Sequence, residues 1–361
     1  MLGNALVFAA SRGLSAMPVL RNFAGAAAVL IASWSFSATA EPSFVPVHRD
    51  NFPDPHIVLH NGEFIAYSTN YGLNLPMLSS RDLIHWTPVT GPDGEPIDGM
   101  PRLGPWAKTD RTWAPEVMQV GGKWLLYYTA ANPKLSTQCI GVAVAAGPKG
   151  PFVDNTAAPL VCQPKEGGTI DANPFRDADG SLYLYYKSDG NAVGKRSIIW
   201  GQRLAADGLT VVGEPVALLR DDQDWEWKLV EAPAMVKTPG GYQMFYSAAY
   251  YGWDYPKERL SRYATGYANC ASPLGPCKDA KENPLLHSFK DREAGCLSGP
   301  GHPAIFQVGQ RHFMAFHAWS ATRDCRPAED KRYLYIAPLF WTDGKPQLGP
   351  SLRVRKEGER G

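Results

Sequence analysis

The 361-residue chain lacks an excess of charge of either sign, because Lys and Arg number 36 against 35 for Asp and Glu, and the formal net charge is +1. Nucleic acids and anionic membranes are bound by concentrated positive charge, so neither is expected to be a partner. A neutral ligand suits this balance better. The 11 Trp and 16 Tyr residues supply rings that can stack on such a ligand, although aromatic-rich cores also occur without one.

No apolar run is long enough to span a bilayer. The apolar stretch at 23–32 follows two arginines and leads to the small-residue triplet Ala-Thr-Ala at 38–40. This order is typical of a signal peptide and predicts cleavage before Glu41. We therefore expect a signal peptide over residues 1–40, a mature chain over 41–361, and a periplasmic or secreted location.

The six cysteines include no C-x-x-C pair, which argues against a zinc or dithiol redox site. An even count after a signal peptide indicates disulfides, with fifteen pairings possible. Proximity in the sequence favours Cys139–Cys162, Cys270–Cys277 and Cys296–Cys325.

A five-fold repeat organises the mature chain. Each unit has a polar or acidic residue near a proline, an apolar strand, a glycine turn and an aromatic strand. The marker prolines are Pro55, Pro115, Pro174, Pro233 and Pro303, and the turn glycines are Gly62, Gly122, Gly180, Gly241 and Gly309. A repeat of about 60 residues with several short strands and no long helix fits a propeller blade. The sequence therefore predicts an all-β, five-bladed β-propeller in a single domain.

Three repeats place a carboxylate close to the marker proline: Asp54, Asp171 and Glu231. Inner propeller strands converge on the axis, so we expect these groups to share one pocket. An acid near a proline can instead cap a turn, and that alternative holds for each residue taken alone. Three carboxylates in one pocket repel one another, which predicts a raised pKa for at least one of them.

Paired carboxylates of this kind can hydrolyse glycosides. Glu231 has apolar sequence neighbours, which favour a protonated carboxyl and the role of general acid. Asp54 heads a strand, where backbone amides can keep it ionised as a base. Asp171 would be the third charge, which keeps Glu231 protonated and oriented.

Five motifs, taken in order, resemble glycoside hydrolase family 43. They are Phe-Pro-Asp-Pro at 52–55, Trp-Ala-Pro-Glu at 113–116, Ile-Asp-Ala-Asn-Pro-Phe at 170–175, Glu-Ala-Pro-Ala-Met at 231–235 and Gly-Pro-Gly-His at 299–302. That family contains α-L-arabinofuranosidases, arabinanases and β-xylosidases on five-bladed propellers. The resemblance implies that Asp54 is the base, Asp171 the pKa modulator and Glu231 the acid. It also implies inversion at the anomeric carbon, for which the acid and base carboxyls stand roughly 6.5–9.5 Å apart.

Three further residues are candidates for the same pocket. In some arabinanases that the chain resembles, the histidine that matches His302 helps to hold a hydrated metal ion, often calcium, at the propeller axis. The alternative is a hydrogen-bonded structural histidine, and the chemistry itself requires no cofactor. Trp113 is either a wall of the sugar subsite or a core residue. Arg332 either reaches a sugar hydroxyl or Asp54, or lies on the surface.

These observations favour a monomeric, secreted, inverting α-L-arabinofuranosidase that acts from chain ends on plant cell-wall arabinan or arabinoxylan. An exo-enzyme needs a blocked pocket. The loop at 221–228, whose acids we expect to be solvated, and the longer fifth repeat could form the wall. An endo-1,5-α-L-arabinanase with an open cleft, a β-xylosidase and a non-catalytic carbohydrate-binding propeller are the alternatives.

Overall fold

The computed structural model describes residues 44–253, 260–291, 295–322 and 324–353. Regular structure in these residues consists of β-strands and three short 3₁₀ helices, η1 (Pro164–Glu166), η2 (Gly190–Val193) and η3 (Asp224–Glu226). None of the described helices is long and apolar enough to cross a membrane. The prediction of an all-β fold is confirmed, while the predicted signal peptide lies outside the described residues.

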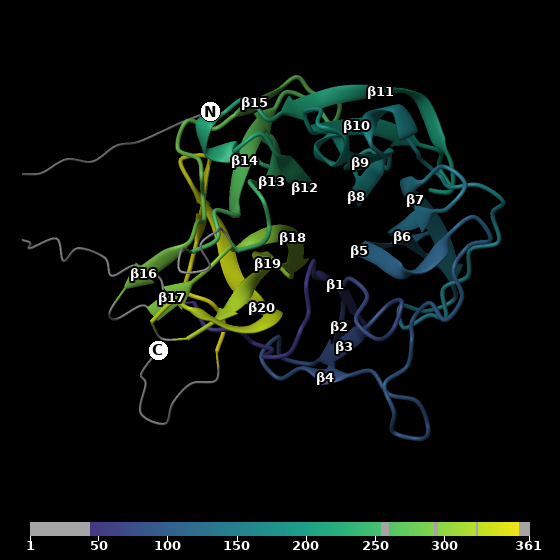
Figure 1. The fold of residues 1–361 in the computed structure, drawn as a ribbon, viewed down its shortest axis with the longest axis horizontal. Helices are drawn as coiled ribbons and strands as arrows, with labels where there is room; N and C mark the ends of the chain where they lie inside the picture. Colours follow the sequence, from purple (N-terminus) through teal and green to yellow (C-terminus); the bar gives the residue numbers. More distant parts are fainter. Residues whose placement is uncertain (1–43, 254–259, 292–294, 323, 354–361) are drawn as a thin grey trace, which may run out of the picture. The chain divides into compact units, whose positions relative to one another are not determined.

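Five antiparallel sheets form the five blades of a propeller (Figure 1). The first blade contains β1 (His56–His60), β2 (Glu63–Tyr67), β3 (Met77–Ser80) and β4 (Thr87–Pro88). The second contains β5 (Lys108–Val120), β6 (Lys123–Asn132) and β7 (Thr137–Ala145). The third contains β8 (Thr169–Arg176), β9 (Leu182–Ser188), β10 (Ile198–Leu204) and β11 (Val211–Arg220).

The last two blades follow the same order of strands. The fourth contains β12 (Val230–Thr238), β13 (Gly241–Ala248), β14 (Ala264–Cys270) and β15 (Cys277–Asp279). The fifth contains β18 (Gly301–Val308), β19 (Arg311–Ala321), β20 (Pro327–Thr342) and β21 (Lys345–Leu348). A separate hairpin, β16 (Phe289–Asp291) and β17 (Gly295–Leu297), accounts for the extra length of the fifth repeat.

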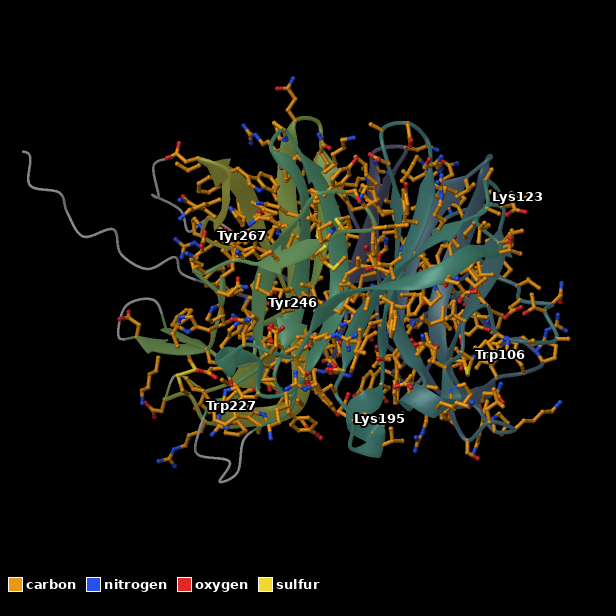
Figure 2. The ribbon with its side chains drawn as sticks, turned by 90° about the horizontal axis from the view of Figure 1, so that it is seen from above. Trp106, Lys123, Lys195, Trp227, Tyr246 and Tyr267 are labelled. Carbon is orange, nitrogen blue, oxygen red and sulfur yellow. A yellow bond between two sulfur atoms is a disulfide. The ribbon has the colours of Figure 1, made fainter. Side chains whose placement is uncertain are left out.

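The inner strands β1, β5, β8, β12 and β18 form a ring, since each contacts the next and β18 contacts β1. The turn glycines of the five repeats all have a positive φ, as their place in tight hairpins requires. In Figure 2, Lys123 beside one such turn lies on one face of the propeller, and Lys195 and Trp227 lie on the other. The aromatic second strands fill the core with buried rings, among them Tyr67, Tyr128, Tyr185, Tyr246 and Phe316.

The segment before the first blade closes the ring by running along β20 of the last blade. The N–H of Val47 donates to the carbonyl of Leu334 (2.9 Å), and the N–H of Phe52 donates to the carbonyl of Arg332 (2.8 Å). This contact brings Asp54 and Arg332 together, although 278 residues separate them in the sequence.

The three predicted disulfides are confirmed: Cys139–Cys162, Cys270–Cys277 and Cys296–Cys325. The last of these ties the β16–β17 hairpin to the segment between β19 and β20.

A residue with left-handed backbone marks the inner strand of every blade. These residues are Asp54, Ala114, Asp171, Ala232 and His302, with φ of 53°, 45°, 57°, 53° and 55°. Asp54, Asp171 and His302 are therefore equivalent positions in their blades. Glu231 lies one residue before the equivalent position of its blade, at the place that Trp113 has in the second blade.

Candidate active site

The inner ends of the blades enclose a pocket of about 310 Å³. It is lined by all six residues that the sequence singled out: Asp54, Trp113, Asp171, Glu231, His302 and Arg332. Sequence reasoning missed Thr69, Ile170, Lys187, Asp189 and Asn191, which also line it. Tyr250 and Tyr251, which follow β13, complete one side of the pocket.

The carboxylate of Asp54 is held by side chains. The Oγ1 of Thr69 donates to Oδ2 (2.5 Å), and the Nη1 of Arg332 donates to Oδ1 (3.0 Å). Burial by itself would raise the pKa of Asp54, but Arg332 and, after it, His302 hold it well below its ordinary value. Asp54 is therefore ionised, as expected. The expectation that backbone amides keep it so was wrong, because the ionised form depends on these side chains.

His317 binds the backbone of Asp54 as a neutral ring. The backbone N–H of Asp54 donates to its Nδ1 (3.1 Å), which assigns the ring proton to Nε2. Burial and the charge of Arg332 lower the pKa of His317 to about 4. The ring stacks on Tyr263, with 5.7 Å between centroids, and its Nε2 has no hydrogen-bond partner in the described part of the chain.

Asp171 is the acid with the raised pKa. Burial raises the pKa of Asp171 to about 7, with His302 opposing this shift and the Glu231 carboxylate adding to it. Its backbone N–H donates to the Oγ1 of Thr129 (3.2 Å), and its Oδ2 accepts the N–H of Ala232 (3.0 Å). Repulsion was the expected cause of a raised pKa in the pocket, but burial is the main cause and the Glu231 charge a smaller one. The group concerned is Asp171 rather than Glu231, the expected acid.

Glu231 is not in the apolar setting that its sequence neighbours suggested. The ammonium of Lys187, whose side chain is only 1% exposed, donates to the Oε2 of Glu231 (3.0 Å) and to the Oδ1 of Asp189 (3.1 Å). Burial opposes the charge on Lys187, but Glu231, Asp189 and Asp171 raise the pKa of this lysine above its ordinary value. A buried ammonium therefore lies directly against the predicted general acid.

Trp113 and Arg332 both line the pocket. Trp113 is half-buried on β5 and forms part of the pocket wall. Arg332 binds Asp54, and its guanidinium lies over the rings of Tyr251 (5.0 Å) and Trp319 (5.8 Å). The alternative of a surface arginine is wrong, since its side chain is 15% exposed.

The expectation for the loop at 221–228 holds only in part, since of its acids Asp222 and Asp224 are exposed. Asp221 and Glu226 are buried rather than solvated, and Glu226 accepts hydrogen bonds from the Tyr246 hydroxyl (2.8 Å) and the Gln223 N–H (2.8 Å). Burial raises the pKa of Glu226 to about 7. Neither this loop nor the β16–β17 hairpin lines the pocket, so the predicted wall is absent from the lining that the structure describes.

The family model of the glycosyl hydrolases family 43 matches residues 45–346, which run from before β1 into β21. The chain belongs to this family. It is 26% identical to the extracellular endo-α-(1→5)-L-arabinanase 2 of Bacillus subtilis, over 64% of this chain and 51% of that protein. It is 24% identical to the extracellular exo-α-(1→5)-L-arabinofuranosidase of Streptomyces avermitilis, over 87% of this chain and 65% of that protein. The chain thus spans about half to two thirds of the length of these two relatives.

Solved structures agree with this assignment. A thermostable family-43 glycoside hydrolase is 28% identical with a TM-score of 0.69, over 86% of this chain and 96% of that one. An endo-1,4-β-xylanase from Bacteroides thetaiotaomicron is 28% identical with a TM-score of 0.65, over 87% of this chain and all of that one.

The residues around His302 do not form a direct cation site. Its Nδ1 lies 3.4 Å from the Oδ1 of Asp54, and the described residues contain no group of three His, Cys, Asp or Glu side chains able to hold a metal ion. Calcium in proteins takes six to eight oxygen ligands. A calcium ion at the propeller axis would therefore be held mainly by water.

Proposed function

We propose that this family-43 protein is an inverting glycosidase in which Glu231 is the general acid, Asp54 the general base and Asp171 the modulator. The observation that carries the proposal is the contrast between carboxylates in one pocket. Asp54 is held ionised by Arg332, whereas the pKa of Asp171 is raised to about 7. An ionised Asp54 suits a general base. Because the Glu231 carboxylate adds to the raised pKa of Asp171, the pair that these two carboxyls form can hold a proton near pH 7, which Glu231 would donate.

In the proposed reaction, Asp54 accepts a proton from a water molecule that attacks the anomeric carbon. Glu231 donates its proton to the glycosidic oxygen as the bond between that oxygen and the anomeric carbon breaks. Asp171 holds the backbone next to the acid, because its Oδ2 binds the N–H of Ala232. The separation of the acid and base carboxyls implied by inversion stays a prediction.

For the substrate, we propose a terminal α-L-arabinofuranosyl unit of arabinan or arabinoxylan, removed by exo action. The names of the relatives from Bacillus and Streptomyces support an arabinan-type substrate. A volume of about 310 Å³ is at the small end of ligand sites, which favours a single terminal sugar. A β-xylosidase remains an alternative, since family members differ in the sugar they accept.

One observation favours an endo-arabinanase as the second candidate. A hollow of about 670 Å³ lies along blades two and three, and Trp113 and Asp189 line both it and the catalytic pocket. The exposed side chains of Leu135 and Val193 also line it. An open groove on this side could hold the continuation of a polysaccharide chain.

The test is hydrolysis of an aryl α-L-arabinofuranoside, an aryl β-D-xyloside and linear arabinan by the wild type, Asp54→Asn and Glu231→Gln. We expect the arabinofuranoside to be cleaved by the wild type. Asp54→Asn should lose about 10³-fold in kcat/KM on every substrate, and Glu231→Gln should lose as much on arabinan, whose leaving group needs the proton. Asp222→Asn, which changes an exposed acid of the 221–228 loop, is the matched control and should keep full activity.

The other outcomes decide between the alternatives. Cleavage of arabinan alone would indicate the endo-enzyme, and cleavage of the xyloside alone the xylosidase. Sugar binding without cleavage would indicate the binding-only propeller. Proton NMR of the first product follows the anomer, and retained configuration would contradict inversion.

Two further expectations accompany this proposal. Three disulfides and relatives described as extracellular support export to an oxidising compartment. The monomeric state stays a prediction, which sedimentation equilibrium would check.

A further inference from the structure

Five buried side chains occupy matching places where the second strand of each blade reaches the pocket. They are Thr69, Thr129, Lys187, Ser247 and His317. In blades two to five each of them pairs with the residue that precedes the left-handed position of its own inner strand. In blade one the N–H of Thr69 donates to the carbonyl of Pro53, the residue before Asp54.

Four of these side chains make the same kind of hydrogen bond between neighbouring blades. Each accepts the backbone N–H of the left-handed residue of the following blade and so satisfies a buried donor. The pairs are Ala114 to Thr69 (2.9 Å), Asp171 to Thr129 (3.2 Å), His302 to Ser247 (2.7 Å) and Asp54 to His317 (3.1 Å).

Lys187 is the exception, because an ammonium has no lone pair with which to accept a hydrogen bond. The Oδ2 of Asp171 takes over the N–H of Ala232 at this junction. The ammonium instead donates to Glu231 and Asp189. Burying a charge costs folding free energy unless the charge is paired. A serine or threonine would therefore join the two blades at a smaller cost in free energy than this lysine does.

We propose that Lys187 is a positioning residue that acts as the counter-ion of Glu231 during proton donation. This inference rests on the proposed role of Glu231 as the acid. As the proton passes to the glycosidic oxygen, the carbon–oxygen bond breaks and its electron pair stays on the leaving oxygen. Negative charge then develops on the Glu231 carboxylate, 3.0 Å from an ammonium already in place. Such preorganised charge stabilises the transition state without reorganisation.

Asp189 completes the arrangement by fixing the ammonium. Its Oδ1 lies 3.1 Å from the lysine nitrogen, and its side chain is 15% exposed at the pocket. Among the described residues, Asp171 and Tyr263 are titratable groups that also interact with Glu231, and His302 interacts with Asp171. Of these groups and Lys187, only the lysine is a permanent cation.

The first experiment compares Lys187→Met with the wild type on two glycosides of the same sugar. One carries 2,4-dinitrophenol, a leaving group that needs no proton, and the other carries methanol, which does. We expect kcat/KM to fall about 100-fold on the methyl glycoside and less than about threefold on the dinitrophenyl glycoside. Lys187→Arg, which keeps the charge, should restore much of the loss.

Lys237→Met is the matched control. Lys237 lies at the far end of β12 with its side chain 44% exposed and pairs with Asp177, so its loss should leave both rates unchanged. An equal loss on both glycosides in Lys187→Met would show a merely structural role and overturn the proposal. Wild-type protein that cleaves neither glycoside nor arabinan would overturn the proposed function instead.

A second variant covers the case in which Lys187→Met does not fold. Asp189→Asn removes the second carboxylate that pairs with the Lys187 ammonium, so this ammonium interacts more strongly with Glu231. The alkaline limb of the kcat/KM profile should then move to lower pH, whereas in Lys187→Met it should move to higher pH. An unmoved limb in Asp189→Asn would also contradict the counter-ion role.

Discussion

Asp54 depends on three neighbours that come from different parts of the chain. Thr69 belongs to its own blade, whereas Arg332 and His317 belong to the fifth. The left-handed φ of 53° turns the Asp54 side chain and backbone to different partners. A non-glycine residue in this conformation is strained, and such strain is concentrated at functional sites.

Replacing Arg332 should move the acid limb of the activity profile. In Arg332→Met the guanidinium no longer favours the ionised carboxyl, so the pKa of Asp54 rises and the base is lost at higher pH than in the wild type. Measured kcat/KM against pH should show this shift. Lys331→Met removes the neighbouring cation, which pairs with Asp50 and Glu329, and should not move the limb. The same limb in Arg332→Met and wild type would contradict this account of Asp54.

Asp171 should lower the folding stability of the protein at alkaline pH, although the proposed reaction needs this residue. Its pKa is raised to about 7 in the fold, above the ordinary value of about 3.9 for an unfolded chain. Its contribution to stability is therefore present below about pH 4 and is lost as pH rises through 7. Asp171→Asn should lose activity, match the wild-type Tm at pH 4 and exceed it at pH 8. Thermal unfolding at both pH values checks this, and an equal Tm difference at the two would count against it.

Among the structural elements, the hairpin β16–β17 shows how an insertion is fitted to the repeat. Its strands pair with each other and not with a blade, and Cys296 on β17 is bonded to Cys325. A short isolated hairpin has little stability of its own. The disulfide therefore holds this hairpin to the rest of the fold, whereas the strands of the blades are held by hydrogen bonds within their sheets.

The disulfides should differ in their effect according to the length of chain they close. The Cys296–Cys325 loop spans 29 residues and the Cys270–Cys277 loop only seven. Chain entropy predicts losses of about 3.6 and about 2.4 kcal/mol when each pair is replaced by serine. Urea unfolding of the two double variants tests the order, and a larger loss for the short loop would contradict it.

At the scale of the whole molecule, the contact that closes the ring of blades also forms part of the catalytic pocket. Phe52 is 2% exposed where the first blade meets the last, and its N–H binds the carbonyl of Arg332. Closure brings β1 beside β18 (Figure 1), and at the same junction Arg332 donates a hydrogen bond to Asp54. Stability and activity are therefore coupled at this junction.

Phe52→Ala should weaken both together. Removal of a buried phenylalanine ring costs about 3–5 kcal/mol, and kcat should fall because Arg332 loses its alignment with Asp54. Phe340→Ala, which truncates a 45% exposed ring on β20, should change stability by less than about 0.5 kcal/mol. Unfolding curves and initial rates measure both effects. A Phe52→Ala variant that is destabilised but fully active would show that the geometry of the site does not depend on this closing contact.

The sequence alone determined the five blades, the three disulfides and the six pocket residues that include Asp54 and Glu231. These features follow from a linear repeat and from cysteines close in the sequence, both of which are local patterns. Only the tertiary structure decided that Lys187 lies against Glu231, that Asp171 has the raised pKa and that side chains keep Asp54 ionised. Those contacts join residues from different blades, and charge and desolvation in a closed pocket depend on every blade at once. The position of Lys187 in the series with Thr69, Thr129, Ser247 and His317 was the one signal that could have revealed it.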